Sequence, residues 1–341
     1  MLNRKPIMIS GQYPQTRMRR NRKHGFLRKL VQESKLTRTD LIYPIFVIDH
    51  PTRSENIPAM PDVMRLGFDP LLRTAELCLE LGIPAIALFP AIDSSLKTPD
   101  AEEAFNPKGL IPKVTYELKK RFGELGIITD IALDPYTTHG QDGIVDNHHH
   151  ILNDETIAAL CEQALSHAQA GVDIVAPSDM MDGRISCIRK TLDQHGFVDT
   201  AILSYAAKYA SHFYSPFREA VGSKKSLGKA DKHTYQMHLT NSDEALYEAS
   251  LDIKEGADIL LVKPAMAYGD IIYRIKNELK VPTFAYQVSG EYAMLKAASQ
   301  KNWLEEKHCV LEALGCIKRT GCNAIFSYYA LQVAKWLQDA E

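Results

Sequence analysis

The apolar positions of this chain fall into eight short runs, separated by longer stretches in which apolar residues recur every three or four positions. Short uninterrupted runs are typical of buried parallel strands, and the spacing between them is typical of amphipathic helices. Two helical stretches, 155–171 and 242–257, carry a glycine at the end, where it commonly stops a helix. The eight runs are residues 41–48, 83–89, 127–134, 172–178, 200–206, 258–263, 282–288 and 323–328.

Eight strands that alternate with helices predict an α/β fold, a (β/α)8 TIM barrel. We expect this catalytic barrel to span residues 36–341 and an extended N-terminal arm to span residues 1–35. The alternative is a doubly wound sheet, which would need a glycine-rich phosphate loop after the first strand. The sequence PIFVIDHPTRSEN at that position has none.

Two lysines, Lys208 and Lys263, each close one of the apolar runs. Ligands of such folds bind at the carboxyl ends of the strands, so both amines are expected to face one cavity. Burial and a neighbouring like charge lower the pKa of an amine, and a neutral amine attacks ketones to form a Schiff base. A single lysine after a strand is usually a solvated or salt-bridged surface residue. Two at equivalent positions predict an enzyme that holds two carbonyl substrates.

Carboxylates and hydroxyls follow two other strands. Asp134 and Asp142 come after the third run, and Ser178 and Asp179 come at the end of the fourth. Clustered carboxylates bind a hard cation or shift each other's pKa for proton transfer, unless they form a solvated turn. We therefore treat these residues as candidate catalytic groups.

Residues 211–236 form a long connection directly after Lys208. Such a segment at a catalytic face is more often a lid than a mobile surface loop. Its Arg218, Lys232 and Gln236 are candidates to bind one carboxylate group of a substrate. Hydroxyls at the ends of the last two strands are candidates to bind another, and they belong to Tyr286, Ser289 and Tyr328.

The composition excludes several classes of protein. The 341 residues are 45% apolar with a net charge of -2, so nothing indicates a nucleic-acid partner for the whole chain. No apolar run approaches the roughly 20 residues of a membrane span, and the N-terminus lacks the apolar core of a signal peptide. The six cysteines form no CxxC pair and are expected to be reduced thiols. These observations predict a cytoplasmic protein.

The first part of the chain is strongly basic. A basic arm can bind nucleic acid, or it can wrap around a partner subunit. We favour the second interpretation because aromatic residues do not interleave the charges and the rest of the chain carries the opposite balance. The basic residues are Arg4, Lys5, Arg17, Arg19, Arg20, Arg22, Lys23, Arg28 and Lys29.

Seven motifs together resemble one family. They are SYAAKYAS, APSDMMDGR, SPFREA, KHTYQM, LLVKPAMAY, YQVSGEYAM and IFSYYAL. From about Leu41 onward the chain is similar to delta-aminolevulinic acid dehydratases, also called porphobilinogen synthases. The resemblance implies a barrel enzyme that condenses two molecules of 5-aminolevulinate, with loss of two waters, in tetrapyrrole (heme) biosynthesis. It also implies a homo-oligomer, an octamer in this family.

The resemblance assigns roles to the candidate residues. Lys263 and Lys208 match the two Schiff-base lysines, on the propionate side and the acetate side of the product respectively. Arg218, Lys232 and Gln236 match acetate-side positions, and Tyr286, Ser289 and Tyr328 match propionate-side positions. Glu248 matches an allosteric magnesium ligand. Asp134, Asp142 and Asp179 are candidate proton carriers.

The chain departs from the zinc-dependent branch of this family, which carries three cysteines after the third strand. Ala132, Asp134 and Asp142 stand at the matching positions. Thiolates select zinc, whereas carboxylates prefer hard cations. We therefore do not expect zinc in this site, and we expect the activity to respond to an allosteric Mg²⁺.

Two other functions compete with this interpretation. A class I aldolase also uses a barrel and a Schiff-base lysine, but it needs only one such lysine. A barrel that binds nucleic acid through the basic arm would leave Lys208 and Lys263 without a role.

Overall fold

The structure is a computed structural model that describes residues 11–228 and 231–339. The described residues divide into two units between Lys35 and Leu36. In the first unit, helices α1 (Arg20–Lys23) and α2 (Gly25–Leu30) contain no buried residue. The predicted basic positions Arg4 and Lys5 lie outside the described residues.

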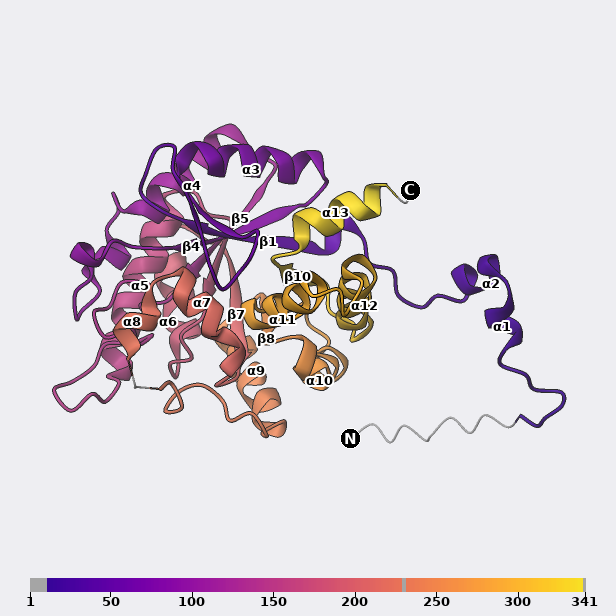
Figure 1. Ribbon diagram of the computed structural model, residues 1–341. Coiled ribbons are helices and arrows are strands. Elements are labelled where there is room, and N and C mark those ends of the chain that lie inside the picture. The colour runs from indigo at the N-terminus through magenta and orange to yellow at the C-terminus, as the bar shows by residue number, and fades with distance from the viewer. Residues whose placement is uncertain (1–10, 229–230, 340–341) are drawn as a thin grey trace. The chain divides into compact units, whose positions relative to one another are not determined.

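The second unit is a closed (β/α)8 barrel, as the sequence predicts (Figure 1). Eight parallel strands pair in the order β10-β9-β8-β7-β6-β5-β4-β1, and β10 pairs back to β1 to close the barrel. Each predicted run forms one of these strands with ends shifted by a few residues. The strands are β1 (Leu41–Val47), β4 (Ala85–Pro90), β5 (Gly126–Ile131), β6 (Ile174–Pro177), β7 (Ala201–Lys208), β8 (Ile259–Lys263), β9 (Thr283–Gln287) and β10 (Ala324–Ser327).

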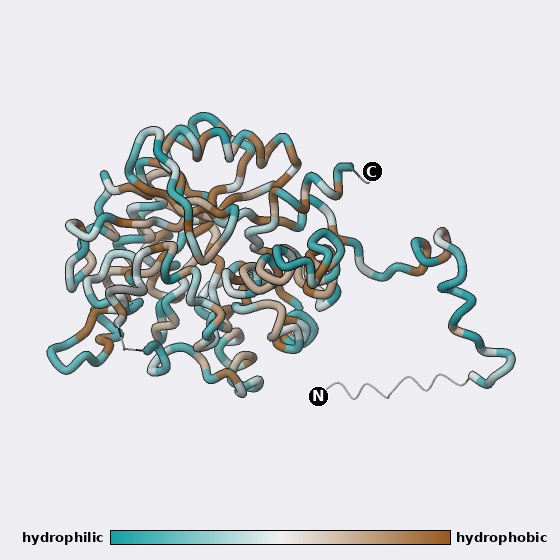
Figure 2. The backbone as a smooth tube through the Cα atoms, in the orientation of Figure 1, coloured by the Kyte–Doolittle hydropathy of each residue, from teal (hydrophilic) through white to brown (hydrophobic). Residues whose placement is uncertain are grey.

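Helices follow the barrel strands and bury their apolar faces against them. Figure 2 shows the hydrophobic segments gathered in the strands and the hydrophilic ones on the outer turns. Gly256 ends α9 with a φ of 107°, a backbone conformation that glycine adopts without strain. The helices are α3 (Phe68–Glu80), α4 (Leu110–Arg121), α5 (Asn153–Gln169), α6 (Arg184–Gln194), α9 (Asp243–Glu255), α10 (Gly269–Leu279), α11 (Ser289–Gln300), α12 (Glu306–Arg319) and α13 (Ala330–Gln338). None of the helices in the described residues is both long and apolar enough to cross a membrane.

A small hairpin follows β1 and was not predicted. Its strands, β2 (Ser54–Asn56) and β3 (Met64–Leu66), pair antiparallel, and β3 also pairs parallel with β1. Strands of three half-exposed or exposed residues have no detectable apolar period, so the pattern of the sequence could not reveal them.

The predicted lid segment, 211–236, is largely helical where it is described. It contains the 3₁₀ helix η4 (His212–Tyr214), α7 (Ser215–Ala220) and α8 (Ser223–Leu227). Four further 3₁₀ helices are η1 (Arg38–Asp40), η2 (Ser94–Leu96), η3 (Glu102–Phe105) and η5 (Met266–Tyr268).

Strand β7 contains an irregularity that bears on the site. Its pairing with β8 shifts by one residue between Ser204 and Ala207, and beyond the shift Lys208 lies directly opposite Lys263. Side chains of a regular strand alternate between its two faces, so residues three apart face opposite ways. An extra residue removes this constraint. Tyr205 and Lys208 can therefore both face the barrel interior.

Candidate active site

A narrow cavity lies at the carboxyl ends of the barrel strands, and the lid segment covers it. Its volume is about 20 Å³, which is room for about one water molecule. Any substrate of several atoms can therefore enter only if the lid or the lining side chains move. The lining residues are Asp130, Asp134, Asp142, Ser178, Lys208, Tyr214, Phe217, Arg218, Lys232, Gln236 and Lys263.

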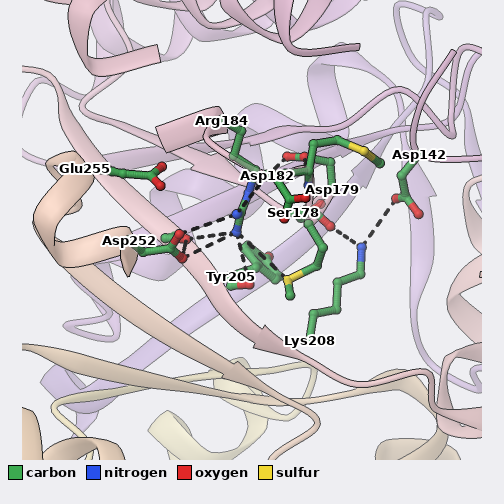
Figure 3. Close-up of polar contacts among 12 residues, drawn as sticks. Asp142, Ser178, Asp179, Asp182, Arg184, Tyr205, Lys208, Asp252 and Glu255 are labelled. Carbon is green, nitrogen blue, oxygen red and sulfur yellow. Dashed lines mark hydrogen bonds and ion pairs between the residues drawn. The ribbon is translucent and has the colours of Figure 1, made fainter. Parts of the chain in front are cut away.

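Lys208 lies among oxygen atoms. Its Nζ is 3.3 Å from Asp142 Oδ1 and donates a hydrogen bond to the backbone carbonyl of Ser178. Figure 3 shows the ammonium reaching from β7 between these two groups. The side chain is buried, so this pairing offsets the cost of taking its charge out of water.

Lys232 joins the two aspartates that follow β5. Its Nζ lies 3.2 Å from Asp134 Oδ2 and 2.7 Å from Asp142 Oδ2. Tyr235 Oη also donates to Asp142 Oδ2, at 2.8 Å. Burial alone would raise the pKa of Asp142, but the ammonium groups of Lys208 and Lys232 hold it below its usual range. Asp142 is therefore an ionised counter-ion, and Asp134 and Asp142 converge as the sequence suggested.

Lys263 lies in a different environment, among aromatic rings. Its Nζ is 4.8 Å from the ring centroids of Phe217 and Tyr286, 5.1 Å from that of Tyr214 and 5.3 Å from that of Tyr205. Burial, and after it the charge of Lys208, lowers the pKa of Lys263 to about 7. The lowered pKa makes the unprotonated, nucleophilic form of this amine accessible near neutral pH.

Asp130, within β5, is a buried carboxyl that also lines the cavity. Burial raises its pKa, and the charges of Lys263 and Lys208 oppose that rise. Its Oδ1 has no hydrogen-bond partner among the described residues. The raised pKa allows Asp130 to hold a proton near neutrality.

The three hydroxyls predicted as one set are divided by the structure. Tyr286 and Tyr328 share a hydrogen bond of 3.0 Å between their hydroxyl oxygens, beside Lys263. Ser289 Oγ instead accepts a hydrogen bond from the backbone N–H of Phe217 at 3.0 Å and lies 3.3 Å from the carbonyl oxygen of Phe213. In this state Ser289 holds the lid.

Asp179 faces away from the cavity, toward a buried arginine. Its Oδ2 is 3.5 Å from Arg184 Nε, and Arg184 also pairs with Asp252 at 3.4 Å (Figure 3). Burial raises the pKa of Asp179 to about 6, although Arg184 opposes the rise. This orientation favours a supporting role for Asp179 over direct contact with substrate.

Glu248, on α9, lines a separate cavity of about 490 Å³ together with Glu244 and Asp182. Burial, and after it the charge of Asp252, raises the pKa of Glu248. In the described part of the chain, no group of three histidine, cysteine, aspartate or glutamate side chains is arranged to enclose a metal ion. A cation beside Glu248 would have to keep most of its water ligands, as Mg²⁺ does.

Comparisons with known proteins identify the family of this chain. The family model of delta-aminolevulinic acid dehydratase matches residues 15–336. The chain belongs to the delta-aminolevulinic acid dehydratase family.

Two relatives in this dehydratase family match over almost their full length. The delta-aminolevulinic acid dehydratase of Bradyrhizobium diazoefficiens is 51% identical over 94% of this chain and 91% of its own length. That of Rhodobacter capsulatus is 47% identical over 96% and 98%. The crystal structure of the Toxoplasma gondii dehydratase, in complex with the reaction product porphobilinogen, superposes with a TM-score of 0.93 and 49% identity, covering 95% of this chain and 92% of that one.

The structure adds residues to the site that the sequence analysis of this dehydratase did not single out. Tyr205, Tyr214 and Phe217 surround Lys263, and Arg184 orients Asp179. Phe217 lies in the quoted motif SPFREA, and Tyr205 lies in SYAAKYAS, so both positions were visible as parts of a motif. No pattern within the sequence links them to Lys263, because the contact exists only in the folded barrel.

Proposed function

We propose that this chain is a porphobilinogen synthase, which condenses two molecules of 5-aminolevulinate with loss of two waters through Schiff bases at Lys208 and Lys263. One observation carries the proposal: two buried lysines are opposite each other on neighbouring strands, one among carboxylates and one among aromatic rings. A reaction that treats two identical ketones differently needs two different amines. The family assignment supports the same activity.

The chemistry begins with the unprotonated amine of Lys263. It attacks the ketone carbon of one 5-aminolevulinate, and loss of water from the adduct gives an iminium. Lys208 forms the second iminium in the same way after it gives up its proton. Each iminium makes its carbon electrophilic and the adjacent carbon more acidic. Because one cavity holds both substrates, most of the entropic cost of a two-molecule condensation is removed.

The carboxyl groups divide this work. Asp142 stays ionised beside Lys208 and Lys232 and stabilises the positive charge of the iminium at Lys208. Asp130 has a raised pKa and lines the cavity, so it can accept and return a proton near neutral pH. The structure favours Asp130 over Asp179 for this role because Asp179 faces Arg184.

The polar residues of the lid bind the carboxylate of the acetate-side substrate. Arg218, Lys232 and Gln236 all line the cavity, and each carries N–H groups that can donate to a carboxylate. On the propionate side, Tyr286 lies beside Lys263, and Tyr328 shares a hydrogen bond with Tyr286. When the lid moves, Ser289 loses its hydrogen bonds to the backbone of Phe213 and Phe217, and its hydroxyl becomes available to the same substrate as Tyr286 and Tyr328.

The metal proposal rests on carboxylates alone. Glu248, Glu244 and Asp182 share a cavity wide enough for a hydrated cation, and burial near Asp252 makes the charge on Glu248 costly. An allosteric Mg²⁺ that keeps its waters fits these donors. Zinc does not fit the catalytic cavity, since Asp134 and Asp142 pair with lysines where thiolates would be needed.

Assembly and location are further parts of the proposal. The described arm buries none of the residues of its two helices and exposes Tyr13, Phe26 and Leu30. Such a segment gains order by lying on another copy of the chain, which supports a homo-oligomer, an octamer by family resemblance. We place the enzyme in the cytoplasm, with neither membrane nor nucleic acid as a partner.

Borohydride trapping tests the function. The chain is incubated with 5-aminolevulinate and borohydride, and the modified peptides are identified by mass spectrometry. Adducts on Lys208 and Lys263, with porphobilinogen formed when borohydride is omitted, support the synthase. An adduct formed only with a sugar phosphate would indicate an aldolase, and no adduct with either would indicate a non-enzymatic protein.

A further inference from the structure

Helix α7 carries two residues of the cavity but has little stability of its own. It spans only Ser215–Ala220, and its Phe217 and Arg218 line the cavity beside Lys263. Helices much shorter than about 12 residues are marginal in isolation. The position of Phe217 and Arg218 therefore depends on what holds the two ends of α7.

The first half of α7 is held by packing and by Ser289. The ring of Phe217 lies 5.5 Å from that of Phe46 and 5.3 Å from that of Phe89, measured between centroids. The backbone N–H of Phe217 donates to Ser289 Oγ at 3.0 Å. These contacts fix the depth of the helix in the barrel mouth but leave its other end to be accounted for.

The second end of α7 is held by Arg65, a residue of the small β3 strand. Arg65 Nε donates to the carbonyl oxygen of Ala220 at 2.6 Å, and Nη2 donates to that of Glu219 at 2.8 Å. The third nitrogen of the guanidinium, Nη1, pairs with Glu55 Oε2 at 3.2 Å. A planar fork of fixed donors suits two adjacent carbonyls, and the last carbonyls of a helix lack partners within it.

The hairpin places Arg65 for this contact. Glu55 and Arg65 are opposite each other on β2 and β3, and Arg65 is opposite Phe46 on β1. One strand pair thus presents Phe46 to the ring of Phe217 and Arg65 to the end of the same helix. A cavity of about 340 Å³ borders this end of α7, lined by Arg65, Ala220 and Gly222 among others, so apolar packing does not fill the space there.

We propose that Arg65 is a positioning residue: its guanidinium clamps the last carbonyls of α7 and thereby holds Phe217 and Arg218 over the two lysines. The contact itself is a property of the free protein, and its catalytic consequence rests on the proposed function. Closure of the site then depends on a hairpin that follows β1 and pairs with it.

Hydrogen exchange in the full-length protein tests the contact directly. Arg65→Met removes both side-chain donors of the fork, and the carbonyl of Glu219 then keeps the backbone hydrogen bond from Gly222 N–H. Amides of residues 215–222 should then exchange on the order of tenfold faster or more. Arg53→Met is the matched control, because Arg53 also pairs with Glu55 but is an exposed residue that makes no side-chain bond to α7. Unchanged exchange in Arg65→Met, or equal acceleration in Arg53→Met, would overturn the proposal.

Steady-state kinetics test the consequence. Arg65→Met should raise KM for 5-aminolevulinate on the order of tenfold with a smaller loss of kcat, since α7 can still close but is less often closed. Arg65→Lys keeps the charge but not the fork, so its KM should lie between those of the wild type and Arg65→Met. It also serves as the folded variant if Arg65→Met is unstable. Equal KM in all variants with faster exchange would confine Arg65 to stability and refute positioning. If the wild-type chain makes no porphobilinogen, the exchange result still decides the clamp while the proposed function fails.

Discussion

Lys208 and Lys263 are direct neighbours across β7 and β8 because β7 contains one extra residue between Ser204 and Ala207. If the register of Ser204 and Leu260 continued without this shift, Lys208 would lie opposite Pro264. The extra residue also allows Tyr205 to share the barrel interior with Lys208. The ring of Tyr205 then helps to surround Lys263, while Lys208 reaches Asp142. The irregularity thus places the two amines next to each other in different environments.

Replacement of either lysine should abolish turnover. Lys263→Ala and Lys208→Ala each remove an amine that no neighbouring group can replace, so we expect porphobilinogen formation to fall to the background of the assay. Both lysines lie at strand ends, where substitution affects the site more than the core, so circular dichroism should be unchanged. Lys301→Ala, at an exposed position, is the control. Normal turnover in either purified active-site variant rules out the two-imine mechanism.

Imine formation at Lys263 should increase with pH through about 7. The unprotonated amine is the nucleophile, and the pKa of Lys263 is lowered to about 7, first by burial and then by the charge of Lys208. Trapping with cyanoborohydride between pH 5.5 and 9, followed by peptide mapping, should give a midpoint near 7. Nα-acetyl-lysine, whose ε-amine has a pKa of about 10.4, serves as the reference amine.

Two variants should move this midpoint in opposite directions. Lys208→Ala removes a like charge that disfavours the ammonium, so the midpoint should rise. Asp130→Asn removes a carboxylate that favours the ammonium, so the midpoint should fall. A midpoint that stays near that of Nα-acetyl-lysine would show that Lys263 is not desolvated. Shifts of the same sign would contradict the charge assignments.

The sequence pattern predicted the barrel because its strands are buried on both faces and its helices on one. Lys208 and Lys263 were identifiable for the same reason, since a charged residue that closes an apolar run lies at a strand end. The convergence of Asp134 and Asp142 was foreseeable from their spacing after one strand. These features depend on neighbours in the chain, which a sequence displays.

Other parts of the site depend on contacts between distant segments. Arg65 reaches the carbonyl of Ala220 across 155 positions, and Lys232 reaches Asp134 across 98. Ser289 has the hydroxyl that a substrate ligand requires, but the fold engages it with the lid backbone. Neither apolar period nor residue type encodes such partners, so only the structure could assign them.

The buried charges around Arg184 should be important for stability. Arg184→Met leaves the carboxylates of Asp179 and Asp252 buried without their cation, which costs roughly 3–5 kcal/mol when one partner of such a cluster is removed. Urea unfolding at fixed protein concentration measures the loss. Arg121→Met, which breaks an exposed pair with Glu117, should cost at most about 1 kcal/mol. Equal losses in the two variants would argue against a buried charge cluster.

Activity should survive zinc chelation and respond to Mg²⁺. Asp134 and Asp142 occupy positions where thiolates would be needed for zinc, and they already pair with lysines. Glu248→Ala should weaken the response to Mg²⁺ without removing basal activity, whereas Glu162→Ala, on an exposed position of α5, should leave the response intact. Loss of activity with a zinc-selective chelator, restored by zinc alone, would show that the metal assignment is wrong. A full Mg²⁺ response in Glu248→Ala would place the ion elsewhere.

Deletion of residues 1–24 should give smaller particles of lower activity while the barrel stays folded. The arm is basic, and in its described part the helices α1 and α2 bury no residue, so its own chain provides too little apolar burial to offset the entropy of ordering. We propose that an acidic surface on a second barrel supplies both burial and counter-charge. Light scattering measures the particle mass. Deletion of residues 1–10 alone serves as the milder truncation, because it keeps Arg17, Arg19 and Arg20 and should retain more of the assembly.

An undiminished mass after deletion of residues 1–24 would refute a role for the arm in assembly. Strong retention of the intact chain on DNA, lost with the arm, would instead support the nucleic-acid interpretation.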